Sequence, residues 1–431
     1  MNEYDSNRIL DLTKKINYNL TNKFNDADCY ILNTCHIREK ATEKVYHDIG
    51  RLKKEFRDKK KPLVIIAGCV AQAEGDIILK KEKYIDAVVG PQSYHKINQI
   101  ILNLEQDNSR LNHTEFEPIE KFDQLNLVKN NNSKVSSYVT IQEGCDKFCK
   151  FCVVPYTRGP EQSRSLIEIT SEAKHLVKQG TKEIILLGQN VNAYSFGKHR
   201  LSDLLYALDD IKDLKRIRYT TSHPKDFTED LIESHARCKK LMPLLHLPVQ
   251  SGSTKILKRM NRGHTLEEYL EIIEKLKKKN PNLRFSSDFI IAYPDETELD
   301  FNKTISLMEK IKFVNSFSFI FSPRPGTPAA NLNQIDFKIA KNRLLRFQSV
   351  ASQIKKDYRN KLVGSTQNVL FENDAQKENT FFGRDEYFNS VIVHSKDDLT
   401  GKIKKVNISS CNHNTLFGEI IGDLKKTEYA A

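Results

Sequence analysis

Residues 143–159 read EGCDKFCKFCVVPYTRG, and three cysteines fall within this stretch: Cys145, Cys149 and Cys152. With the spacing C-x3-C-x2-C, one short loop can direct three thiolates at the same point. Structural zinc sites usually take four ligands, often as two separated pairs. A cubic iron–sulfur cluster held by three thiolates leaves one iron open, whereas four cysteines close it. Ligand number and softness favour the cluster, and a zinc knuckle with a distant fourth ligand is the alternative.

The residues after the third cysteine extend this pattern. VVPYTRG occupies residues 153–159, and Ser163-Arg164 follows shortly after. The C-x3-C-x2-C spacing is the signature of radical S-adenosylmethionine (SAM) enzymes, and the longer string resembles the methylthiotransferases of that superfamily. The chain is identified as a member of the MiaB family of tRNA methylthiotransferases, and the resemblance covers essentially the whole chain.

Composition sets the broad class of the protein. A chain of 431 residues can form about two to four domains. It carries 68 Lys and Arg against 56 Asp and Glu, a net charge of +12. That charge suits an anionic partner such as nucleic acid, although Lys is frequent throughout the chain.

The sequence start and the apolar runs argue against secreted and membrane-spanning classes. MNEYDSNRIL lacks the basic patch and apolar core of a signal peptide. No apolar run approaches the roughly 18 residues of a membrane span. The eight cysteines are therefore expected to be metal ligands or buried thiols rather than disulfides. We expect a cytoplasmic monomer without membrane contact.

Residues 1–102 alternate helical and extended patterns. Apolar spacing predicts a helix from Asp5 to about Asn19. Short apolar runs predict buried parallel strands at Asp28–Asn33, Leu63–Ala67 and Ala87–Val89. This order predicts a doubly wound α/β domain.

Cys35 and Cys69 each follow the carboxyl end of one of these strands, where open α/β sheets place their sites. The alternative is two free core cysteines, a commonly buried residue type. The strings NTCHIREKA and GCVAQAEGD resemble two of three cluster motifs of the methylthiotransferases. The resemblance implies that both cysteines are ligands of an auxiliary 4Fe-4S cluster.

The family's third auxiliary cysteine lies in a first-strand string similar to TYGCQMN, which this sequence does not contain. Cys29 precedes Cys35 by six residues on the same strand, so about 20 Å separates them at roughly 3.3 Å per residue. Cys29 therefore cannot complete the set. The preferred explanation is a start site placed too late. The alternative is a true truncation, with a labile two-ligand cluster and a gap in the sheet.

A repeated strand–helix pattern predicts an open (βα)6 barrel, the radical SAM core of the family. The cysteine loop follows its first strand and so lies at the carboxyl-end face, where such barrels place their sites. The six candidate strands are Tyr138–Gln142, Glu183–Gly188, Arg216–Thr221, Leu244–Val249, Phe285–Ile291 and Ser316–Phe321.

Residues at the other strand ends are similar to the family's SAM contacts, although each taken alone is more often a structural turn residue. A glycine there allows the backbone to approach a ligand closely. The candidate SAM-binding residues are Gly188, Gln189, Asn190, Gln250, Ser251 and Asp288.

One loop departs from the family pattern. Where the family usually reads close to GFPGET, this chain has AYPDET at residues 292–297. If both replaced glycines need positive φ, Ala292 would be strained and Asp295 tolerated.

The last third of the chain predicts contacts to RNA. SPRPGTPAA at residues 322–330 resembles a rigid loop near the substrate end of the barrel, with a simple capping turn as the alternative. Residues 331–361 read as a helix with eight basic and two acidic residues, which could follow phosphates or be a solvated surface. Short strands after it predict a small OB-like barrel, and GRDEYFNSVIV at residues 383–393 resembles the tRNA-binding TRAM domain.

The expected domains follow from these patterns and from the resemblance. They are an N-terminal methylthiotransferase domain over residues 1–102, a polar linker over 103–130, a radical SAM core with its basic helix over 131–361, and a TRAM domain over 364–427.

The resemblance implies methylthiolation of carbon 2 of N(6)-dimethylallyladenosine at position 37, in a tRNA anticodon stem-loop. That carbon has no acidic proton, so the reaction needs a radical that a cofactor supplies. The implied cofactors are SAM and two 4Fe-4S clusters, one at Cys145, Cys149 and Cys152, with electrons from a flavodoxin- or ferredoxin-type donor. The target base is expected to flip out of its loop.

Two other functions stay open from the sequence. A methylthiotransferase could act instead on a ribosomal-protein aspartate or on threonylcarbamoyl-adenosine. A non-catalytic, zinc-dependent RNA-binding protein would use the same cysteines as zinc ligands and would contain neither iron nor sulfide.

Overall fold

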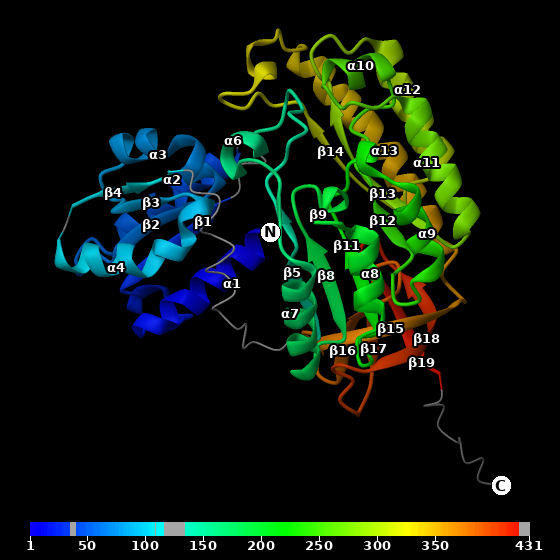
Figure 1. Ribbon diagram of the computed structural model, residues 1–431, viewed down its shortest axis with the longest axis horizontal. Helices are drawn as coiled ribbons and strands as arrows, with labels where there is room; N and C mark the ends of the chain where they lie inside the picture. The colour runs from blue at the N-terminus through cyan, green and yellow to red at the C-terminus, as the bar shows by residue number, and fades with distance from the viewer. Residues whose placement is uncertain (35–39, 108, 116–133, 422–431) are drawn as a thin grey trace.

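The computed structural model describes residues 1–34, 40–107, 109–115 and 134–421 (Figure 1). Cys35 and most of the expected linker lie outside these residues. An N-terminal α/β unit, a central strand–helix unit and a C-terminal β-barrel follow one another along the chain. Within the described ranges, no helix is both long and apolar enough to cross a membrane.

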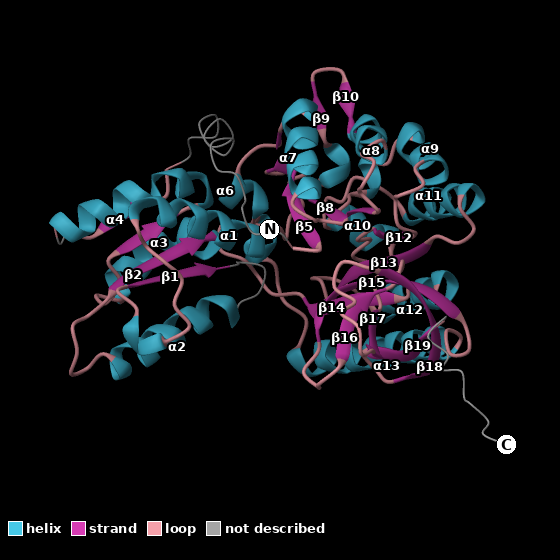
Figure 2. Ribbon diagram, turned by 90° about the horizontal axis from the view of Figure 1, so that it is seen from below, coloured by secondary structure: helices cyan, strands magenta, loops and turns pink. Residues whose placement is uncertain are grey.

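The N-terminal unit is a three-layer α/β sandwich (Figures 1 and 2). Its parallel sheet has the order β1-β2-β3-β4: Cys29–Thr34, Leu63–Gly68, Ala87–Val89 and Leu111–His113. Alternate side chains of β2 point to opposite faces, as strand geometry requires. Val64 and Ile66 pack with α2 (Lys40–Glu55) and α3 (Cys69–Lys81). Ile65 and Ala67 pack with α1 (Asn2–Thr13) and α4 (Ile97–Gln106).

Two expectations about this unit are wrong. The polar segment from residue 103 is not a linker throughout, because α4 reaches Gln106 and β4 pairs with β3. A three-residue strand is too short for a periodic signal, and Arg110 fixes it by donating hydrogen bonds to carbonyls of the α3–β3 connection. Nor is there a gap between the described strands, because β1 pairs with β2 over its whole length.

Six parallel strands form the central unit, as the sequence predicts. They are β5 (Ser136–Thr140), β8 (Glu183–Leu187), β11 (Arg216–Tyr219), β12 (Leu244–His246), β13 (Arg284–Ile291) and β14 (Asn315–Ile320). They pair as β5-β8-β11 and β12-β13-β14, and a bridge between Ile217 and Leu241 joins the two ladders. The result is an open, partial barrel with edge strands β5 and β14.

Helices cover the outer side of this sheet around one large apolar core. They are α7 (Leu166–Lys178), α8 (Leu201–Asp209), α9 (Glu229–Arg237), α11 (Leu266–Lys279), α12 (Glu298–Ile311) and α13 (Phe337–Asn360). Capping boxes start three of them: Ser165 with Glu168, Thr265 with Glu268, and Thr297 with Asp300. Each pair satisfies backbone donors of the first turn, so the sequence itself sets these helix starts.

The C-terminal unit is the closed barrel that the sequence predicts, with strand order β15-β16-β17-β19-β18. Its strands are Thr366–Asp374, Thr380–Arg384, Ser390–His394, Ile403–Cys411 and Thr415–Ile420. Arginines fix it to the central unit. Arg216 and Arg218 donate to carbonyls at residues 384–386, and Arg359 of α13 donates to those of Asn412 and Asn414.

Candidate functional site

The cysteine loop lies between two short paired strands, β6 (Gln142–Glu143) and β7 (Gln162–Ser163), and contains helix α6 (Val154–Arg158). Backbone hydrogen bonds hold it at several points. Cys145 N donates to the Gly159 carbonyl at 3.1 Å, and Lys150 N to that of Met260 at 2.9 Å. Ala329 N of the SPRPGTPAA segment donates to the Lys150 carbonyl at 3.0 Å, so that segment supports the cysteine loop.

The three thiols of the loop lie in one partly buried environment. Burial raises the pKa of Cys145 to about 12, and the Cys149 and Cys152 thiols also raise it. Burial likewise raises the pKa of Cys152 to about 11, with contributions from Cys149 and from Cys69. Arg262 Nη1 donates to Cys149 Sγ at 3.5 Å. Three soft sulfur donors on one loop, with a cation at one of them, fit an iron–sulfur cluster.

No group of three Cys, His, Asp or Glu side chains is arranged around a single metal ion in the described part of the chain.

A glutamine-lined turn lies beside the cysteine loop, at the carboxyl ends of β5 and β8. Gln142 Oε1 accepts hydrogen bonds from the backbone N–H of Gln189 and Asn190, both at 3.1 Å. Gln189 Oε1 in turn accepts from Gly144 N at 2.8 Å. A Cβ at residue 188 would lie 2.7 Å from Gln142 Oε1, so Gly188 allows this close approach. The predicted Gly-Gln-Asn turn therefore orders the start of the cysteine loop.

Asn190 connects this turn to a charged group. Its Nδ2 donates to Asp226 at 2.7 Å and to Glu161 at 3.0 Å. Lys147, within the cysteine loop, pairs with the same Asp226 at 2.7 Å. Sequence reasoning missed Asp226 because 79 residues separate it from Lys147.

The other predicted cofactor residues lie on β13 and on the segment after β12. Gln250 has a φ of 77° and its backbone exchanges hydrogen bonds with β13. Ser251 is fully buried and accepts a hydrogen bond from Ser253 N at 3.2 Å. Asp288 is part-exposed, and its carboxylate lies 3.5 Å from His246 Nε2. Phe285, Phe289 and Ile291 pack in the outer core, so Asp288 faces the inner side of the sheet.

Several polar atoms near this face are buried without a hydrogen-bond partner among the described residues. They include Arg262 Nε, Asn190 Oδ1, Ser222 Oγ, His223 Nε2 and His264 Nε2. The two histidine rings lie 5.9 Å apart. Burial and Arg262 lower the pKa of His264 to about 4 and lower that of His223 strongly. Both rings are therefore neutral at pH 7 and can accept or donate one hydrogen bond to a ligand.

The AYPDET loop has the geometry of the glycines it replaces. Ala292 has a φ of 58° and Asp295 a φ of 67°. The expected strain at Ala292 is thus present, and Ala292 N donates to the Glu296 carboxylate at 2.9 Å. Asp295, a residue type that tolerates this region, pairs with Arg259.

Cys69 begins α3 directly after β2, and the cysteine loop approaches it through one side chain. Arg158 Nε donates to Cys69 Sγ at 3.4 Å, and Arg158 Nη2 to Asp5 at 2.6 Å. Gln92 donates to the Arg158 carbonyl at 2.6 Å. Cys29 lies at the opposite end of the sheet, paired with Leu63, so it cannot join Cys69.

Comparisons with known proteins agree with this architecture. The radical SAM superfamily matches residues 139–308, the uncharacterized protein family UPF0004 matches residues 1–90, and the TRAM domain matches residues 360–421. A radical SAM methyltransferase, TsrM from Kitasatospora setae, superposes with a TM-score of 0.58 at 12% identity, over 77% of this chain and 72% of that one. That likeness shows a shared fold alone.

Full-length relatives share much more sequence. The tRNA-2-methylthio-N(6)-dimethylallyladenosine synthase of Pelagibacter ubique is 60% identical over 432 residues, covering 99% of this chain and 96% of the relative. Proteins of the same name from Ruegeria sp. and Wolbachia pipientis are each 46% identical, over 98% and 97% of this chain and 96% and 97% of their own lengths.

Proposed function

The chain belongs to the radical SAM family of tRNA-2-methylthio-N(6)-dimethylallyladenosine synthases, and we propose that it methylthiolates carbon 2 of N(6)-dimethylallyladenosine at position 37 of tRNA. The observation that carries the proposal is the C-x3-C-x2-C loop at the carboxyl ends of the barrel strands, next to Cys69 of the N-terminal unit. The names of the relatives do not favour a ribosomal-protein aspartate or threonylcarbamoyl-adenosine as the substrate. They do not favour a zinc-dependent RNA-binding protein either.

Cys145, Cys149 and Cys152 are the residues that would hold a SAM-binding 4Fe-4S cluster. Such a cluster would supply the one-electron chemistry that generates a radical from SAM for an unactivated C–H bond. The chain's own residues prepare the site. Arg262 places a positive charge at Cys149 Sγ, and the backbone anchors at Gly159 and Met260 hold the loop.

Gly188, Gln189, Asn190, Gln250, Ser251 and Asp288 are the proposed SAM-site residues, in two roles. Gln189 and Ser251 use their side chains within the protein, so they shape the site. Asn190 Oδ1 has no partner in the described chain, and the Asp288 carboxylate is part-exposed on the inner face. These two offer an acceptor to the ammonium, hydroxyl or amine groups of SAM.

Cys35 and Cys69 are the proposed ligands of the auxiliary, sulfur-donating cluster. The contact from Arg158 to Cys69 and the effect of Cys69 on the pKa of Cys152 support a second site beside the first.

The domain roles and partners are further parts of the proposal. Residues 1–102 would carry the auxiliary cluster, 131–361 the radical chemistry and 364–427 the tRNA contact. The TRAM match supports the tRNA contact. We further propose that the protein is a monomer in the cytoplasm, where tRNA is modified. A flavodoxin- or ferredoxin-type donor would reduce it.

Anaerobic reconstitution tests the reaction directly. The reconstituted protein is incubated with SAM, a one-electron reductant and an anticodon stem-loop carrying N(6)-dimethylallyladenosine. Nucleoside mass spectrometry should show a methylthio group in place of one hydrogen. A stem-loop with unmodified adenosine is the matched substrate control, and no product from either substrate would contradict the proposal.

A further inference from the structure

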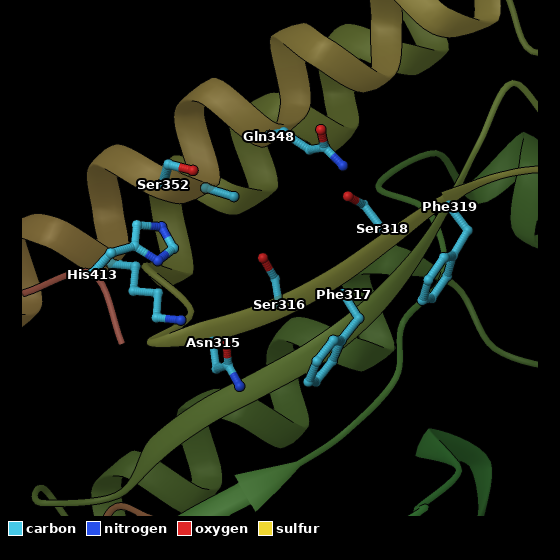
Figure 3. Close-up of a pocket in the computed structure, with 10 residues that line it drawn as sticks. Asn315, Ser316, Phe317, Ser318, Phe319, Gln348, Ser352 and His413 are labelled. Carbon is cyan, nitrogen blue, oxygen red and sulfur yellow. The ribbon is translucent and has the colours of Figure 1, made fainter. Parts of the chain in front are cut away.

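A pocket of about 340 Å³ lies between α13 and the edge strand β14, on the opposite side of the sheet from Asp288 of β13. Figure 3 shows Ser316 and Ser318 pointing toward α13, where Gln348 and Ser352 lie, while Phe317 and Phe319 point the other way. His413, from the turn between β18 and β19, closes one end. The volume of the pocket is at the lower end of the range for ligand-binding sites, which is about 300–1,000 Å³.

Most residues that line this pocket are polar or basic, and the others are Phe317, Phe319 and Ala351. Ser316, Ser318, Gln348 and Ser352 offer hydroxyl and amide groups that both donate and accept hydrogen bonds. Lys355 adds a positive charge, and none of the lining residues is acidic. No carboxylate of the described residues forms an ion pair with Lys355. Such a lining favours an anionic ligand that also carries hydrogen-bonding edges.

The pocket joins two units that are fixed relative to each other. Arg359 donates to the carbonyls of Asn412 and Asn414, at 3.1 and 3.0 Å, which holds the turn with His413 against α13. In the described sheet β14 pairs only with β13, so its other edge carries no neighbouring strand.

The inner side of the same strand leads to the candidate site. Phe317 is opposite Asp288 in the strand register, and its ring lies 6.3 Å from that of His246. Phe317 is also 47% exposed, so an aromatic surface is available for a stacked base at this edge. A chain that crosses the edge of β14 would pass from the pocket to the inner face.

We propose that this pocket binds one unpaired nucleotide of the substrate RNA, next to the base that is modified. Lys355 and His413 contact its phosphate, and Ser316, Ser318 and Gln348 contact the edges of its base. Single-stranded loops are recognised in this way, because their bases can be splayed into protein pockets. The inference rests on the proposed tRNA function, and it adds a binding position for the RNA next to the modified base.

The test is binding of the anticodon stem-loop, by fluorescence anisotropy, to the reconstituted full chain. Two variants address the pocket: Lys355→Glu reverses its charge, and Gln348→Trp fills it from an exposed helix position. Lys356→Glu is the matched control, since it makes the same charge change on the neighbouring exposed residue, which does not line the pocket. Unfolding temperatures confirm that the variants fold.

Both pocket variants should weaken binding about tenfold or more, and Lys356→Glu clearly less. Lys355→Gln should also reduce the slope of log K against log salt by about 1, as the loss of one phosphate contact does. If wild type binds and the pocket variants bind no worse than Lys356→Glu, the pocket proposal is wrong and the proposed function stands.

If wild type neither binds nor modifies the stem-loop, the proposed function fails and this inference fails with it. Light scattering tests a third outcome, in which the chains associate with one another. An association of chains that Gln348→Trp abolishes would assign the β14 edge to a protein strand instead, and would overturn the RNA proposal.

Discussion

The two cysteine sites of this molecule are built in different ways. Cys145, Cys149 and Cys152 lie within eight residues of sequence, on a loop whose own backbone is anchored on both sides. Cys69 stands alone at the start of a helix among the described residues, and its contact to the other site is an arginine 89 residues away. The first site is local in sequence, and the second depends on how two units dock.

Because of this difference, the two groups of cysteines depend on different contacts. A local loop holds its thiols wherever the barrel folds, because the ligands and their anchors belong to one unit. At Cys69 the contact from the other unit comes from Arg158, which is almost fully buried with Asp5. Damage to the loop should therefore abolish all chemistry, whereas damage at the junction should separate radical formation from sulfur transfer.

The largest effect is expected for Cys149→Ala. Loss of one of three thiolates removes the cluster that binds SAM, so both 5′-deoxyadenosine and the methylthiolated nucleoside should fall to background. Chromatography of both products measures this. Cys411→Ala is the control. That thiol belongs to the C-terminal unit and contacts Asn360 at the end of α13, so the variant should retain full turnover.

Cys69→Ala should separate the two activities. The loop cluster is intact, so 5′-deoxyadenosine should still form, while the methylthio product falls at least about tenfold relative to the parent chain. The same assay measures both. Equal loss of both products would show that the two sites do not act independently.

Arg158→Ala tests the junction by its stability. The change leaves Asp5 buried without its partner, which typically costs about 3–5 kcal/mol. Denaturant unfolding measures the cost. Lys134→Ala is the matched control, since Lys134 pairs with Glu3 across the same junction but both are exposed, and such pairs contribute about 1 kcal/mol or less. Equal effects of the two changes would contradict a buried, charge-dependent junction.

The smallest effect is expected for Ala292→Gly, in the loop that follows β13. A left-handed conformation costs an L-residue about 1–2 kcal/mol, and the entropic cost of glycine offsets part of the gain. The free energy of unfolding should rise by about 1 kcal/mol or less. Asp295→Gly should give no gain, because it also removes the contact to Arg259.

The sequence predicts those parts of the fold that local patterns determine. The apolar runs identify the six strands of the central sheet, and the turn spacing identifies the C-terminal barrel. The replaced glycines correctly indicate positive φ at Ala292 and Asp295. These features depend on residues that are close in the chain, so a single sequence contains them.

Features that form between distant residues could not be predicted in this way. Arg262 contacts Cys149 across 113 residues, and its position in an ordinary basic stretch carries no signal. The pKa values of His223 and His264 are lowered by burial and by the charge of Arg262, which depend on the folded structure. β4 has three residues in a polar segment and gains its place from pairing with β3.

Iron and acid-labile sulfide per chain, after anaerobic reconstitution, test the central claim most directly. The parent chain should hold at least about four irons with equal sulfide, and Cys149→Ala should lose about four, the content of one cubic cluster. Cys69→Ala should keep about four irons and lose only the iron that the parent chain holds beyond these four. Bound zinc in place of iron, or iron unchanged in Cys149→Ala, would contradict the assignment of the cysteine loop as the radical SAM site.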